Sequence, residues 1–257
     1  MPVMASRRVK QFAYGLLYLL IVAGIAVIVR SAFLTVPPTC SDGRQNQGEE
    51  DVDCGGPCMS CKVNDLSIII KEKRYFDLSR IGKTTFYLQF ENPTTEFWVK
   101  KFDYTLNVYN KLGVKVGSFS GISSLAPGGK RPVAIVAANI DARDISRTDL
   151  GIMDPEWAPL VEYHVDGISI TDMKTQSISG NRIYVSGVAT NNVAATAKKL
   201  DITAIFRDRE AQIVNASMTT IDEIPPFSKK NFEIFLTPDQ ISQIDMTKTE
   251  LFVEVTR

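Results

Sequence analysis

"KKFDYTLNVYNKLGVKVGS" at residues 100–118 and "KKLDITAIFRDREAQIVNA" at residues 198–216 align without a gap. Both begin with Lys-Lys-apolar-Asp, continue with alternating apolar and polar residues, and place a polar turn at the same position. Alternation with a period of two is typical of a half-buried β-strand, because successive side chains point to opposite faces of a sheet. The pair therefore predicts two copies of one strand–turn–strand unit.

The similarity extends to both sides of this pair. Further segments of the first copy have counterparts at a nearly constant spacing: 65–70 with 167–172, 124–140 with 223–241, and 144–150 with 245–251. The spacing is far longer than the 20–50 residues of most solenoid repeats, so it indicates a duplicated domain. Short strands separated by Gly, Pro, Asn and Asp favour antiparallel sandwiches.

We therefore predict an all-β fold with two tandem antiparallel, immunoglobulin-like β-sandwiches, at residues 63–160 and 161–257. "MDPEWAPL" at residues 153–160 contains two prolines, which stiffen a chain, and we expect it to be the junction.

The two copies resemble the small bacterial sandwich modules called FxLYD domains, which are immunoglobulin-like and similar in general shape to late-embryogenesis-abundant type 2 domains. The resemblance is carried by "YTLNVYNKLGVKVGSFSGISSLAPG" at residues 104–128 and "ITAIFRDREAQIVNASMTTIDEIPP" at residues 202–226. "LNVYN" and "AIFRD" stand where the family has its Phe-x-Leu-Tyr-Asp string. The resemblance implies an extracytoplasmic accessory or adhesion-like module from a bacterium, and it brings no catalytic residues.

The N-terminal stretch "QFAYGLLYLLIVAGIAVIV", residues 11–29, has the length and apolar character of a single membrane span. Arg7, Arg8 and Lys10 precede it, and the positive-inside rule leaves such a flank in the cytoplasm. We predict a cytoplasmic N-terminus at residues 1–11 and a signal anchor at residues 12–34. A cleavable signal peptide is the alternative, but its apolar core is shorter, and "VRSAFLTVPP" offers no small-x-small site.

The predicted location is therefore the cell membrane, with most of the chain outside the cytoplasm. Lys+Arg and Asp+Glu both number 29, so the formal net charge is zero. A nucleic-acid partner normally requires a basic excess, and we expect none. The expected partners are the membrane, through one span, and a protein at the cell envelope.

All four cysteines, Cys40, Cys54, Cys58 and Cys61, fall in the segment 35–62 that follows the predicted anchor. An even number of cysteines in an oxidising compartment predicts disulfides. Three connectivities are possible. We slightly favour Cys40–Cys58 with Cys54–Cys61 over Cys40–Cys54 with Cys58–Cys61, because two residues between cysteines make a tight ring. Four thiolates holding zinc are the alternative.

Acidic and amide side chains crowd the same segment, which is too short to have a core of its own. Calcium prefers six to eight oxygen ligands, so we take it as a candidate cofactor. The candidate ligands are Asp42, Asn46, Glu49, Asp51 and Asp53. The register of an EF-hand loop is missing. The stretch resembles a motif of bacterial surface and secreted proteins, C-x-D-G-x-x-N-x-x-E-x-D-V-D-C-G-G-x-C-x-x-C.

Catalytic constellations are scarce. His164 is the one histidine and the one candidate base for a serine or cysteine nucleophile, and we expect it to be a surface residue. Paired acids such as Asp222 and Glu223 are more typical of turns than of a glycosidase site. We predict a non-enzymatic interaction or structural module. The alternatives are a carbohydrate- or cell-wall-binding module that uses Trp98 or Trp157, and an enzyme that uses Asp222 and Glu223.

Overall fold

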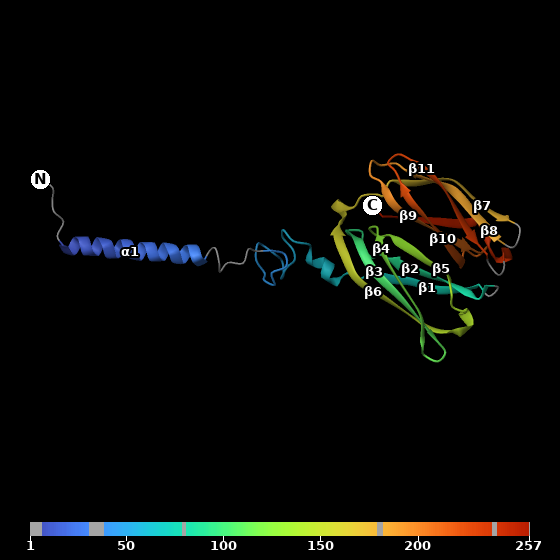
Figure 1. Cartoon of the computed structure of the whole chain (residues 1–257), viewed down its shortest axis with the longest axis horizontal. Helices are drawn as coiled ribbons and strands as arrows, with labels where there is room; N and C mark the ends of the chain where they lie inside the picture. The colour runs from blue at the N-terminus through green and yellow to red at the C-terminus, as the bar shows by residue number, and fades with distance from the viewer. Residues whose placement is uncertain (1–6, 31–38, 79–80, 179–181, 238–240, 257) are drawn as a thin grey trace. The chain divides into compact units, whose positions relative to one another are not determined.

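The computed structural model describes residues 7–30, 39–78, 81–178, 182–237 and 241–256 of the 257-residue chain (Figure 1). It forms two compact units, Met1–Asp65 and Leu66–Arg257. Each predicted segment has a part outside the described residues: 1–6 of the cytoplasmic terminus, 31–34 of the anchor, 35–38 of the cysteine-rich segment, 79–80 of the first sandwich, and 179–181, 238–240 and 257 of the second.

The first unit contains the helix α1 (Arg7–Val29) and ends in the short 3-10 helix η2 (Cys61–Asp65). Within α1, Gln11–Val29 has a mean hydropathy of 2.6, and none of it is buried. A helix of this length and composition is compatible with a single-pass membrane anchor or with a signal sequence.

The second unit begins with six antiparallel strands in two three-stranded sheets. They are β1 (Ile69–Leu78), β2 (Lys83–Glu91), β3 (Phe97–Asn110), β4 (Lys115–Leu125), β5 (Lys130–Ala138) and β6 (Ile145–Pro159). The sheets have the orders β1-β2-β5 and β4-β3-β6. Their inner faces share one core, in which Phe86, Phe90, Phe102 and Leu106 are almost fully buried. A 3-10 turn, η4 (Ala142–Asp144), precedes β6.

Six more strands repeat this arrangement after the 3-10 turn η5 (Leu160–Glu162). They are β7 (Ile168–Ile178), β8 (Arg182–Asn191), β9 (Ala197–Arg207), β10 (Ile213–Ile224), β11 (Lys229–Leu236) and β12 (Asp245–Thr256), with η6 (Ile241–Gln243) before β12. The sheet orders are β11-β8-β7 and β10-β9-β12, the same topology as in the first copy. The predicted fold class, two tandem antiparallel sandwiches after an apolar helix and a disulfide-rich segment, is confirmed.

Details of side-chain structure are also duplicated. In the Lys-Lys-x-Asp segments, the second lysine forms an ion pair with the aspartate: Lys101 with Asp103 at 3.7 Å and Lys199 with Asp201 at 2.7 Å. The hairpins between β3 and β4 and between β9 and β10 place Gly113 and Ala211 at the same turn position, both with positive φ.

A buried asparagine at the end of β2 and of β8 pins two turns together in each copy. The Nδ2 of Asn92 donates to the carbonyl oxygens of Phe97 and Ala126 at 2.8 and 3.0 Å. The Nδ2 of Asn191 donates to Ala195 at 2.8 Å and to Ile224 at 3.1 Å. Each buried amide joins a carbonyl a few residues after its own strand to a carbonyl more than 30 residues away, so these asparagines hold two turns of each sandwich together.

The predicted junction at residues 153–160 is wrong for all but its last residue. Met153 to Pro159 belong to β6, where Pro159 lies opposite Phe97 of β3. β6 is an edge strand, and an edge tolerates proline because one side of the strand needs no N–H donor. The sheets of the two copies are separated instead by residues 160–167, which contain η5.

Candidate functional site

The cysteine-rich segment is held by two interlaced disulfides. Cys40 pairs with Cys58, and Cys54 pairs with Cys61, which is the connectivity that the sequence slightly favours. The two bridges overlap between residues 54 and 58, so each closes a loop that contains one end of the other.

Two adjacent glycines lie where the two disulfide loops overlap. Gly55 and Gly56 both have positive φ, which L-residues with a Cβ rarely adopt. A Cβ on Gly55 would lie within 2.5 Å of the Glu50 side chain, and a Cβ on Gly56 within 2.4 Å of the Gly48 carbonyl oxygen. The two glycines of the Cys-Gly-Gly motif are therefore needed because a larger residue at either position would clash with nearby atoms.

The predicted calcium ligands accept hydrogen bonds from the segment's own backbone. Asp53 accepts from the N–H groups of Asp42 and Gly43 at 2.9 and 3.0 Å. Asp42 accepts from the Arg44 N–H and from the Asn46 Nδ2, both at 2.9 Å. The bond from Asn46, supported by backbone N–H donors, lowers the pKa of Asp42 despite an opposing contribution from desolvation.

The other two acids behave in the same way. Asp51 accepts from the Val52 N–H at 2.7 Å, and Glu49 accepts from the Asn46 N–H at 2.9 Å. Calcium at these residues stays a prediction. Asn46 contributes a buried Oδ1 that has no hydrogen-bond partner among the described residues.

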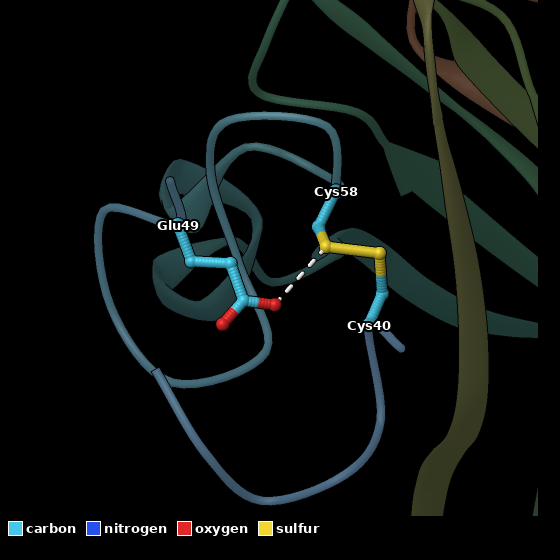
Figure 2. Close-up of side chains that lie close together, drawn as sticks. All are labelled: Cys40, Glu49 and Cys58. Carbon is cyan, nitrogen blue, oxygen red and sulfur yellow. Dashed lines mark hydrogen bonds between the residues drawn. A yellow bond between two sulfur atoms is a disulfide. The ribbon is translucent and has the colours of Figure 1, made fainter. Parts of the chain in front are cut away.

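Glu49 is buried against the Cys40–Cys58 bridge (Figure 2). Its Oε1 lies 3.2 Å from Cys58 Sγ. A disulfide sulfur has no hydrogen to donate, so with an ionised carboxylate this is a close sulfur–oxygen contact. The possible ligand atoms of Cys40, Glu49 and Cys58 lie within 4.8 Å of one another, which is close enough for them to share a metal ion. The predicted four-cysteine zinc site requires thiolates, and neither Cys40 nor Cys58 is a thiolate while their bridge is intact.

The candidates for catalysis and sugar binding are dispersed. His164 is exposed in the loop before β7, and Asp222 and Glu223 are exposed near the end of β10. Trp98 lies edge-on to Tyr163, with ring centroids 5.4 Å apart, and Trp157 packs against the first core. Trp98 and Trp157 come from neighbouring register positions of β3 and β6, but no described contact joins them to His164, Asp222 or Glu223.

Sequence reasoning missed a seam that joins the two sandwiches. Tyr87 and Ala134 from the first sandwich form one buried cluster with Ile205, Ile213 and Ala216 from the second. Tyr87 is fully buried, and this burial raises its pKa to about 12.

Polar side chains cross the seam at one side of this cluster. Glu254 of β12 accepts from the Ser123 Oγ at 2.6 Å and from the Ser124 N–H at 3.1 Å, both in β4. Arg131 donates to the Val253 carbonyl at 2.6 Å and to the Ser124 carbonyl at 3.3 Å. Two edge strands, β4 and β12, thus have backbone groups satisfied by side chains from across the seam.

A cleft of about 240 Å³ opens beside these bonds. Residues of both sandwiches line it, among them Tyr104, Gly121, Arg131, Lys199, Asp201 and Glu254. A Cβ on Gly121 would lie 2.2 Å from the Tyr104 hydroxyl, so glycine makes room for that ring. Burial, with help from Glu254 and Asp201, raises the Tyr104 pKa to about 12, so the phenol stays neutral and can donate a hydrogen bond.

No family model matches the chain, and no curated protein matches it either. Solved structures with some similarity include a red sea bream transglutaminase, with 10% identity, 74% of this chain covered and a TM-score of 0.24. A Bacteroides uniformis beta-glucuronidase 2 has 17% identity, 61% coverage and a TM-score of 0.22, and a glycoside hydrolase family 2 beta-glucuronidase has 14%, 80% and 0.20. The chain covers only 31%, 22% and 26% of these proteins, and such low TM-scores support no argument about function.

Proposed function

We propose that the chain is a non-enzymatic, single-pass membrane protein with its N-terminus in the cytoplasm and its bulk outside. Its paired sandwiches act as an interaction or structural module at the cell envelope, and its partner is a protein.

One observation carries this proposal: two disulfides come directly after an apolar helix in the sequence. Disulfides form and persist outside the cytoplasm, so Cys40–Cys58 and Cys54–Cys61 support export of the chain beyond α1. The basic residues before the apolar stretch support the same orientation. The packed seam supports presentation of the two sandwiches as one body.

Protease treatment of intact cells tests the orientation. We expect digestion of residues 66–257 and protection of an epitope placed at the N-terminus. Reversing the flank with Arg7→Glu, Arg8→Glu and Lys10→Glu should reduce the digested fraction. The same charge change at Lys229, Lys230 and Lys248 serves as the control, and full protection of the sandwiches in the unaltered chain would overturn the proposal.

Cross-linking in native membranes tests the module. The full chain should give defined heteromeric products, and a chain that ends before residue 63 should lose them. An excess of the exported portion, residues 39–257, should compete with these products. Products that survive both treatments would assign the contact to α1 instead.

The cleft at the seam supports a second candidate, a carbohydrate- or cell-wall-binding module. Tyr104 lines the cleft together with two acidic residues, Asp201 and Glu254, whose charges act on its hydroxyl. Hydroxyl and carboxylate groups are suited to the hydroxyls of a sugar. Calorimetric titration with soluble cell-wall glycan fragments, with Tyr104→Phe as the matched variant, tests this candidate. No heat at millimolar fragment would exclude it.

A further inference from the structure

The seam joins two unlike faces. The first sandwich contributes the outer face of the β1-β2-β5 sheet, through Tyr87 and Ala134. The second contributes the outer face of the β10-β9-β12 sheet, through Ile205, Ile213 and Ala216. Since the two copies share one topology, the contact is head-to-tail. Such a heterologous contact leaves one unused copy of each face, and unused faces of this kind allow open-ended chains.

The unused face of the first sandwich lies on the β4-β3-β6 sheet, and strand register identifies its residues. Ala216 lies opposite Ile205 in the second copy, just as Ser118 lies opposite Asn107 in the first. The same comparison can be made for the other seam residues of the second sandwich and for Phe252, which packs against the seam cluster. The equivalents are Asn107 for Ile205, Ser118 for Ala216, Lys115 for Ile213 and Gly151 for Phe252.

At each position that is apolar in the seam, this face therefore carries a polar residue or a glycine. The polar groups also bond to each other, because Ser118 donates to the Asn107 Oδ1 at 2.9 Å. Burying such groups in a further copy of the seam without new hydrogen-bond partners costs free energy.

The unused face of the second sandwich lies on the β11-β8-β7 sheet. Tyr87 lies opposite Ala134 in the first copy, and Ser186 lies opposite Glu233 in the second. Phe76 is partly buried and packs against the seam cluster. The registers give Ser186 for Tyr87, Glu233 for Ala134 and Gln176 for Phe76. Val136 packs against the seam cluster two residues after Ala134, and Phe235 follows Glu233 by the same two residues. Phe235 is apolar and packs on Tyr184 with ring centroids 5.3 Å apart.

Glu233 is the most costly of these changes for a further contact. Its carboxylate accepts from the Tyr184 hydroxyl at 2.9 Å on an exposed surface. In a copy of the seam it would occupy the place of Ala134, which is 3% exposed. The equivalent of Ile213 on the facing unused surface is Lys115, and burying a carboxylate and an ammonium group costs free energy even when the two pair.

We propose that the sandwich pair is a head-to-tail stack closed at two, because polar residues on both unused faces stop a second copy of the chain from continuing the seam. The arrangement corresponds to the polar capping repeats that terminate solenoid proteins. The proposal is independent of membrane anchoring and of the identity of the partner.

Restoring the apolar residues on each face separately tests the proposal in the full chain in detergent. One variant carries Asn107→Ile, Lys115→Ile, Ser118→Ala and Gly151→Phe. The other carries Gln176→Phe, Ser186→Tyr and Glu233→Ala. Light scattering with subtraction of the detergent mass should show each variant alone at the mass of the unaltered monomer. An equimolar mixture should show a doubling of mass, because one restored face of each kind is then available.

A chain that carries both sets should form larger, open-ended species. The proposal is overturned if the unaltered chain already associates through these faces, or if either variant alone associates as much as the mixture. It is also overturned if folded variants stay monomeric when mixed. Circular dichroism checks folding. A mixture of two single variants, Asn107→Ile and Ser186→Tyr, repeats the test with less disturbance of each face and a smaller expected shift in mass.

Discussion

The cysteine-rich segment and the sandwiches achieve order by different means. Among residues 39–65, only Glu49, Cys54 and Gly55 are buried, so the segment has no apolar core. Two covalent bridges and carboxylate–backbone hydrogen bonds replace it. The sandwiches contain no cysteine, and each has a core of fully buried aliphatic and aromatic side chains. A short chain cannot bury enough apolar surface to fold by that means alone, whereas a domain of ordinary size can.

A cavity in the first core should affect only the sandwiches. Phe102 is fully buried and packs edge-on against Phe90, with ring centroids 5.0 Å apart. We expect Phe102→Ala to reduce the free energy of unfolding by about 3–5 kcal/mol. Chemical denaturation followed by tryptophan fluorescence measures the loss, and Phe227→Ala, at a side chain 70% exposed, is the control. Loss of hydrogen-exchange protection in residues 39–65 would show that the two regions are coupled.

Removing a disulfide bridge should destabilise the cysteine-rich segment and leave the sandwiches unchanged, the opposite of the result for Phe102→Ala. The pair Cys40→Ser with Cys58→Ser should cost the segment about 2–5 kcal/mol, since the unfolded chain gains freedom. Hydrogen exchange followed by mass spectrometry should show faster exchange in residues 39–65 and no change in β1–β12. The pair Cys54→Ser with Cys61→Ser provides a comparison with a shorter loop and a smaller expected effect. Slower exchange of the segment in either variant would contradict the comparison.

Substitutions at two glycines of the segment distinguish the destabilisation caused by backbone strain from that caused by a steric clash. Gly56→Ala introduces a Cβ within 2.4 Å of a backbone oxygen. Gly43 also has a positive φ, but the Cβ that Gly43→Ala introduces would meet open space. We expect about 1 kcal/mol of destabilisation for Gly43→Ala and more for Gly56→Ala. The midpoint of bridge reduction by dithiothreitol reports both effects, and equal midpoints for the two variants would contradict the geometry.

Acid should loosen the segment before the sandwiches, with the smallest effect of the four. The folded-state pKa of Asp42 is lowered, chiefly by Asn46, so its stabilising contribution is complete above the ordinary value of 3.8. That contribution is lost as pH falls through the lowered pKa. Hydrogen exchange between pH 5 and 2, corrected for the intrinsic rate, should show the loss, and Asp42→Asn should weaken its pH dependence. An unchanged dependence in Asp42→Asn would assign the effect to other acids.

Much of the fold could be predicted because the signals are local and repeated. Alternation at residues 102–110 predicts a strand, and the structure places β3 there, at Phe97–Asn110. The duplicated Lys-Lys-x-Asp segment predicts two copies, and the sheets share one topology. Local signals also mislead, as the two prolines in β6 show, because the sequence does not reveal which strand is at an edge.

The seam could not be predicted by looking for alternation alone, since it depends on which outer faces meet. One signal was available: "ITAIF" at residues 202–206 is almost continuously apolar, while "YTLNV" at residues 104–108 alternates. A strand buried on both faces reads as a continuous run. Ile205 is the residue that fills the second face. The buried Asn92 and Asn191 gave no such signal, because one acceptor of each, Ala126 and Ile224, lies more than 30 residues away in sequence.

The interlaced bridges also determine how the segment responds to pulling. Without them, tension between Cys40 and Cys61 would extend the intervening chain to about 70 Å. With Cys40 bonded to Cys58, the load passes across a Cα–Cα distance of 5.6 Å and then through three residues, which extend to about 10 Å. The segment therefore acts as a short, nearly inextensible link, whose length under tension changes when the Cys40–Cys58 bridge is reduced.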